Sequence, residues 1–128
     1  MTISKLTSKL LMASMTALFA TSVFAHPDLL SSSPADKSQG PAPATIELKF
    51  SETLNTQFSG ANLVMTEMPN MPNHGAMKIA AKISGGSDGK TMVITPANPL
   101  TEGSYRVDWR AVSSDTHPIK GNITFQVK

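Results

Sequence analysis

The sequence predicts an all-β protein with one domain, a seven-stranded Greek-key β-barrel or sandwich. Several segments alternate apolar and polar residues with a period of two, as half-buried strands do. All 8 glycines and all 9 prolines follow residue 25 and mark turns between these segments. No window of about 12 residues has a clean helical period. Short strands at this spacing are typical of a sandwich or barrel of about seven strands.

The strands predicted with the clearest alternation lie at residues 45–50, 105–110 and 119–128. In the first of them, Ile46, Leu48 and Phe50 share one face, and Glu47 and Lys49 share the other. Weaker strand candidates are residues 61–67, 78–83 and 91–95. The single tryptophan, Trp109, occupies an inward position of its strand and is predicted to lie in the core.

The first 25 residues have the layout of a secretory signal peptide. Lys5 and Lys9 precede an apolar stretch from Leu10 to Ala20, and small residues Val23 and Ala25 occupy the −3 and −1 positions of a cleavage site. A membrane anchor is the alternative, but the apolar stretch is shorter than the roughly 20 residues that a spanning helix needs. We therefore expect residues 1–25 to be removed, leaving residues 26–128 as an exported, periplasmic domain that is not embedded in the membrane.

The charge and the cysteine count exclude several classes of function. The net charge of +2 comes from Lys5 and Lys9, so the domain after residue 25 is neutral and has scattered basic residues. Nucleic acid is therefore not an expected partner. The chain has no cysteine, which excludes disulfides, zinc–thiolate sites, iron–sulfur clusters, cysteine nucleophiles and blue copper centres.

Cleavage after Ala25 would make His26 the first residue, and this changes its chemistry. A free α-amine loses its proton readily to a bound cation, and together with the imidazole Nδ1 it can chelate one metal ion. Two paired nitrogens favour Cu(II) among the divalent metals. Pro27 has no N–H to act as a further ligand, so other ligands must come from elsewhere. The alternative is a frayed terminus without a role.

A second candidate for metal binding is the segment Ser113-Ser114-Asp115-Thr116-His117-Pro118. Asp115 and His117 are two residues apart, so in an extended segment they face the same side. The carboxylate could then bind a metal together with the imidazole or orient the imidazole. A surface turn before the last strand is the alternative interpretation.

Soft ligands recur between residues 65 and 77. Neutral thioethers suit Cu(I) and offer little to Zn(II) or Mg(II). With the prolines of this stretch, a polyproline-II segment of three residues per turn would align the evenly spaced ligands on one face. Met65 could instead pack in the core, and a methionine patch could also serve as a sticky contact for a partner. The candidate ligands are Met65, Met68, Met71, His74 and Met77.

Together with these residues, longer stretches of the sequence resemble the CopC family of periplasmic copper-resistance proteins. The matching text includes HPDLLSSSPAD, IELKFSE, FSGANLVMTEM, KTMVITP and YRVDWRAVSSDTHPIKGNITFQVK. The resemblance covers residues 26–128 and implies a seven-stranded Greek-key barrel of the immunoglobulin-like or cupredoxin-like kind. It also implies two copper sites at opposite ends of that barrel.

The resemblance implies which residues form the two sites. The Cu(II) site would use the amine and imidazole of His26, with Asp115 and His117, and Glu52 as a further oxygen ligand. The Cu(I) site would draw its ligands from the methionine-rich stretch, where we favour Met68, Met71 and Met77 over Met65.

The function predicted is that of a periplasmic copper carrier in copper resistance and homeostasis, without catalytic activity. By resemblance, its partners are an inner-membrane copper transporter and periplasmic or outer-membrane copper-resistance proteins. One alternative is a copper oxygenase, because a terminal histidine plus a second histidine also forms the histidine brace. Against it, Asp115 would occupy coordination space that oxygen needs. The other alternative is a β-sandwich interaction module without a metal.

Overall fold

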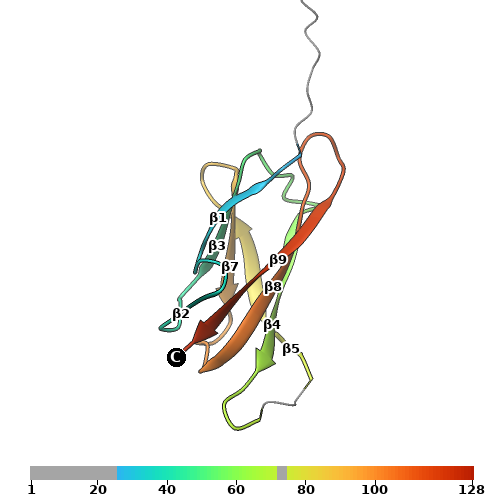
Figure 1. The fold of residues 1–128 in the computed structure, drawn as a ribbon. Helices are drawn as coiled ribbons and strands as arrows, with labels where there is room; N and C mark the ends of the chain where they lie inside the picture. Colours follow the sequence, from blue (N-terminus) through green and yellow to red (C-terminus); the bar gives the residue numbers. More distant parts are fainter. Residues whose placement is uncertain (1–25, 72–74) are drawn as a thin grey trace, which may run out of the picture.

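The computed structural model describes residues 26–71 and 75–128, which form two β-sheets packed face to face (Figure 1). The all-β fold predicted from the sequence is confirmed. One sheet has four strands in the order β1-β3-β7-β6, and the other has five in the order β2-β9-β8-β4-β5. Every neighbouring pair is antiparallel except β2 and β9.

The strands of the described residues are β1 (Leu29–Ser33), β2 (Ser38–Gly40), β3 (Ile46–Phe50), β4 (Gly60–Glu67), β5 (Met77–Ile79), β6 (Ala81–Gly85), β7 (Thr91–Pro96), β8 (Gly103–Ala111) and β9 (Ile119–Val127).

The described residues form nine strands, whereas about seven were expected, and there are two reasons for the difference. The segment predicted at residues 78–83 divides at Ala80, so that β5 joins one sheet and β6 the other. In addition, β1 and β2 have no clear alternation of apolar and polar residues, because β1 reads LLSSS and β2 reads SQG. They are held in place by pairing with β3 and β9, and not by burial of one face.

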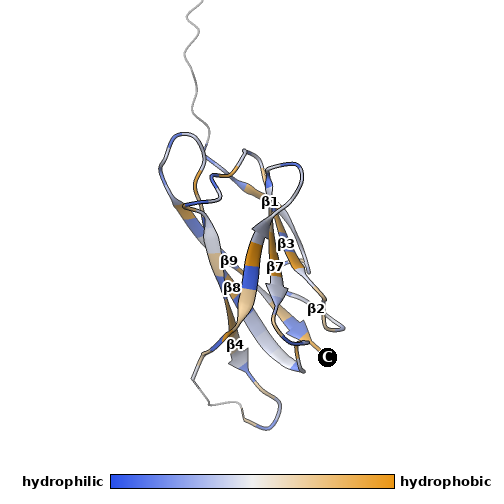
Figure 2. Ribbon diagram, turned by 180° about the vertical axis from the view of Figure 1, so that it is seen from behind, coloured by the Kyte–Doolittle hydropathy of each residue, from blue (hydrophilic) through white to orange (hydrophobic). Residues whose placement is uncertain are grey.

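The core lies between the sheets and consists of the inward positions predicted from the alternation. Ile46, Leu48 and Phe50 of β3 are fully buried, and Trp109 of β8 is buried against them. The rings of Phe50 and Trp109 meet edge to face, with centroids 5.1 Å apart. Figure 2 shows apolar and polar residues in turn along the strands. Burial of these apolar side chains is the main stabilising term of the fold.

Gly121 makes room for the Trp109 ring, and its replacement provides a test of this packing. The two residues are opposite each other in β9 and β8, and a Cβ at position 121 would lie 2.8 Å from Cε2 of Trp109. We expect Gly121→Ala to destabilise the protein by about 1–3 kcal/mol through overpacking. Gly40→Ala, where a Cβ meets nothing within 4 Å, is the matched control. Equal urea-denaturation midpoints for the two variants would contradict the expectation.

The two groups of candidate ligands lie at opposite ends of the sandwich. The start of the described chain and the β8–β9 loop lie at one end, and the segment between β4 and β5 lies at the other (Figure 1). Among the described residues, no helix has the length and apolar character needed to cross a membrane.

Candidate metal centre

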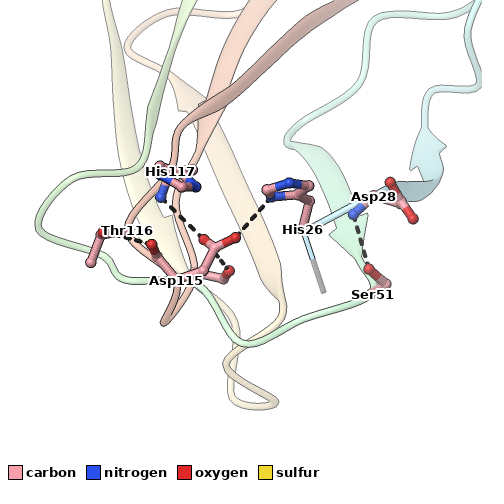
Figure 3. A network of polar contacts seen from close by, with 7 residues as sticks. His26, Asp28, Ser51, Asp115, Thr116 and His117 are labelled. Carbon is pink, nitrogen blue, oxygen red and sulfur yellow. Dashed lines mark hydrogen bonds and ion pairs between the residues drawn. The ribbon is translucent and has the colours of Figure 1, made fainter. Parts of the chain in front are cut away.

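The arm that carries His26 is fixed to the body of the sandwich. Pro27 is fully buried. The N–H of Asp28 donates to Oγ of Ser51 at 2.9 Å, and the N–H of Ser51 donates to the carbonyl of Asp28 at 2.9 Å (Figure 3). Both bonds hold the arm against the end of β3 at Asp28.

The loop between β8 and β9 holds the second half of the site. The N–H of Thr116 donates to the carbonyl of Ser113 at 3.0 Å, which closes a turn. Within this turn, Oδ1 of Asp115 accepts from the hydroxyl of Ser113 at 3.2 Å and from the N–H of His117 at 3.1 Å. Ser113 itself is buried. The Asp115 carboxylate is thus held in one orientation by its own loop.

Three side chains converge where the arm meets this loop. Nδ1 of His26 lies 2.8 Å from Oδ2 of Asp115, and the rings of His26 and His117 have centroids 6.1 Å apart. One ligand atom from each of His26, Asp115 and His117 lies within 4.8 Å of the others. Figure 3 shows Asp115 between the two imidazoles.

The Asp115 carboxylate is nearly buried, whereas the His26 ring is open to solvent. Their side chains are 6% and 54% exposed. Burial raises the pKa of Asp115, but the hydrogen bonds from His117 and Ser113 and the proximity of both imidazoles outweigh it, so the net pKa is lowered. Asp115 is therefore ionised at neutral pH.

The buried Oδ2 of Asp115 indicates what the cluster can bind. Oδ2 is buried and receives no hydrogen bond from the described residues, although it faces a ring nitrogen at 2.8 Å. A buried carboxylate oxygen is costly without a partner. Two ligands bound at about 2.0 Å and at right angles are about 2.8 Å apart, so one cation could bind both atoms. The residues present fit a divalent transition metal with nitrogen and oxygen ligands.

Glu52 is not brought into this cluster. It is partly exposed and follows Ser51, at the end of β3 that the arm contacts, yet the converging group comprises His26, Asp115 and His117 alone among the described residues. Its role as a further oxygen ligand stays a prediction.

Residues 68–71 of the methionine-rich stretch form a turn, where the sequence predicted polyproline II. The N–H of Met71 donates to the carbonyl of Met68 at 3.2 Å, and Asn70 has a φ of 69°. That pattern, with Pro69 before Asn70, is typical of a type II turn, and a positive φ is incompatible with polyproline II. The expectation was wrong here because Asn tolerates the left-handed region.

The described methionines of this stretch nevertheless lie in two pairs. Met68 and Met71 form an isolated β-bridge, and Met65 of β4 is opposite Met77 of β5. Residues opposite each other in an antiparallel ladder have side chains on the same face. Met71 and Met77 are exposed, Met68 packs against the core, and Met65 is buried, as the packing alternative expects. His74 lies outside the described residues.

Two serines contribute to the His26 end of the sandwich although the sequence did not single them out. Ser51 fixes the arm, and Ser113 orients the Asp115 carboxylate. Ser113 precedes Asp115 by two residues, a spacing at which serine and aspartate often form local hydrogen bonds. Ser51 is 23 residues away from Asp28, so no local signal could have identified it.

The fold and the ligand cluster define a β-sandwich protein with a candidate transition-metal site at one end and paired methionines at the other. The CopC domain matches residues 29–128, and the chain belongs to the CopC family.

Two relatives match most of the chain. The sequence is similar to copper resistance protein C of Pseudomonas syringae pv. tomato, with 68% identity over 104 residues, which cover 81% of this chain and 82% of that protein. It is also similar to copper resistance protein C of Escherichia coli, with 58% identity over 109 residues, 85% of this chain and 86% of that protein.

A solved structure supports the architecture. The crystal structure of PcoC, a methionine-rich copper resistance protein from Escherichia coli, has a TM-score of 0.76 and 58% identity, and the match covers 81% of this chain and 100% of that one. The family resemblance seen in the sequence is therefore confirmed.

Proposed function

We propose that this chain is a periplasmic copper-binding protein of copper resistance that carries copper in two sites. His26, Asp115 and His117 would hold Cu(II), with the α-amine of His26 as a further ligand once residues 1–25 are removed. The single observation that carries the proposal is the convergence of these three side chains, with the buried Oδ2 of Asp115 2.8 Å from Nδ1 of His26. The relatives named for copper resistance support the choice of metal.

The methionine pairs at the opposite end would hold Cu(I). Met68, Met71 and Met77 are the preferred ligands, with Met65 and His74 as further candidates. Support comes from the Met65–Met77 pair between β4 and β5 and the Met68–Met71 bridge in the turn. It also comes from the match between neutral thioethers and a soft, singly charged ion. A copper transporter of the inner membrane and copper-resistance proteins of the periplasm or outer membrane would be the exchange partners.

A carrier fits the His26 end better than a copper oxygenase does. The Asp115 carboxylate stands between the imidazoles (Figure 3), where it would fill a coordination position that oxygen activation needs. A carrier has no such need, because it must bind the ion and release it to a partner.

Spectroscopy of the protein loaded at each site tests the proposal. Electron paramagnetic resonance of the Cu(II) form should show nitrogen ligands, and X-ray absorption of the Cu(I) form should show sulfur ligands. A Cu(II) spectrum without nitrogen coupling, or a Cu(I) spectrum without sulfur, would refute the corresponding site.

Acid should release Cu(II) before Cu(I). An imidazole must be neutral to bind a metal, so protons compete with Cu(II) for imidazole ligands at mildly acidic pH. The pKa of Asp115 is lowered, so the carboxylate stays ionised as the pH falls through this range and does not set the release. Thioethers do not titrate, and Cu(I) should remain bound at lower pH. Metal content after dialysis across a pH series measures both, and simultaneous loss of the two ions would contradict the account.

A further inference from the structure

Two basic residues lie directly opposite each other on the outer face of the five-stranded sheet. Arg110 of β8 pairs in register with Lys120 of β9, and both are exposed. Their neighbours Trp109 and Gly121 face the core, so this pair faces solvent. Like charges in directly opposite positions destabilise a sheet. An acidic partner would offset the repulsion between the two side chains.

No acidic residue of the described chain forms an ion pair with Arg110 or Lys120. Neither Arg110 nor Lys120 forms an ion pair within residues 26–71 and 75–128, where the salt bridges are His26–Asp115 and Arg106–Asp108. Asp108 is the nearest acid along β8, but Arg106 binds both of its oxygens, at 2.8 and 3.1 Å. The pair therefore has no direct ion-pair partner within the described structure.

The pair borders a groove that also offers an apolar contact. The groove has a volume of about 890 Å³, and Asp108 and Asn62 line it together with Arg110, Lys120 and Phe58. Phe58 is 56% exposed, which is unusual for a phenylalanine. Aromatic residues and arginine are the residue types enriched at protein interfaces.

One edge of the sheet is open beside this groove. β5 pairs with β4 only at Leu63, Val64 and Met65, so the preceding residues Gly60–Asn62 have no strand partner on that side among the described residues. An open edge can pair with an extended segment of another chain. Gly60 lies in the same row as Arg110 and Lys120, which places the edge beside the charges.

We propose that this groove docks an extended acidic segment of the protein that exchanges Cu(II) with this chain. The acidic side chains would meet Arg110 and Lys120, and an apolar side chain would contact Phe58. Lys120 is three residues after His117, so a partner docked here would reach the metal cluster at the same end of the sandwich. The identity of the partner rests on the proposed function. The acidic and apolar character of the docked segment rests on the groove alone.

Binding of an acidic peptide to the metal-free protein tests the docking surface without relying on copper. The probe is an acetylated peptide of about ten residues that alternates aspartate with leucine, followed by amide NMR spectra at about 50 mM and about 300 mM salt. Shift changes should concentrate at Phe58, Gly60–Asn62, Arg110 and Lys120. The higher salt should weaken binding.

Charge-reversal variants separate this groove from general attraction. The double variant Arg110→Glu/Lys120→Glu should bind the peptide at least about tenfold more weakly. Lys82→Glu/Lys90→Glu makes the same change in net charge at exposed positions in and beside the other sheet, and it should bind as the unmodified protein does.

Three results would overturn the proposal: equal losses in the two double variants, shift changes spread over the whole surface, or no peptide binding at low salt. Vesicles containing phosphatidylglycerol form a further arm, and binding to vesicles without binding to the peptide would replace the acidic segment by a membrane surface. Because no copper is present, failure here leaves the proposed metal sites untouched.

Discussion

Replacing His117 by alanine should weaken Cu(II) binding by at least about a hundredfold while the protein stays folded. The imidazole is one of the three side chains that converge at the site among the described residues. It is exposed, so its removal leaves no cavity in the core. Its loss also leaves the N–H of residue 117 free to hold Asp115 as before. Competition titration with a chelator of known affinity measures the change, and circular dichroism checks the fold.

His74→Ala is the matched control for this prediction. It makes the same substitution in the methionine-rich stretch, which belongs to the predicted Cu(I) site. Its Cu(II) affinity should stay within about twofold of that of the unmodified protein. A His117→Ala protein that binds Cu(II) as tightly as the unmodified chain would remove His117 from the site. A comparable loss in His74→Ala would mean that the two ends do not bind copper separately.

Oxidation of bound copper should move it from the methionines to the His26 end. Thioethers hold Cu(I), whereas the oxidised ion prefers nitrogen and carboxylate ligands. X-ray absorption of the protein loaded with one Cu(I) should therefore show sulfur ligands before oxidation by air and nitrogen and oxygen ligands afterwards. Sulfur ligation that persists unchanged after oxidation would contradict this expectation.

The double variant Met71→Leu/Met77→Leu isolates the contribution of the methionines. Both side chains are exposed, so leucine should be tolerated without loss of the core. We expect Cu(I) affinity to fall at least about tenfold and Cu(II) affinity to remain unchanged. Met92→Leu, at a buried position outside the methionine-rich stretch, controls for the loss of sulfur. An equal fall in Cu(I) affinity in that variant would contradict the assignment of Met71 and Met77 to the Cu(I) site.

The fold could be predicted from the sequence wherever a strand has one buried face. The inward residues of β3, β8 and β9 appear as an alternation that the register confirms. The short strands β1 and β2 could not be predicted, because they are held by pairing with partners that lie far along the chain. The division at Ala80 was equally hidden, since β5 and β6 are one continuous segment in sequence.

The candidate site was predictable to the extent that its signals are local. Asp115 and His117 lie two residues apart, and the predicted cleavage before His26 suggests a chelating terminus. That the two segments meet is a property of the fold, which places the arm beside the β8–β9 loop. The contribution of Ser51 depends on a long-range contact, so it became visible only in the structure. The turn at Asn70 depends on a positive φ at that residue, which the even spacing of the methionines does not indicate.

A free amine on His26 should complete a Cu(II) site together with its own imidazole, Asp115 and His117. The most direct test compares Cu(II) affinity in two preparations, one that begins at His26 and one that retains Ala25. Both keep every side chain of the cluster, and only the first has the amine within chelating reach of the His26 imidazole. We predict that the extended protein binds Cu(II) at least about a hundredfold more weakly. Equal affinities in the two preparations would contradict the account.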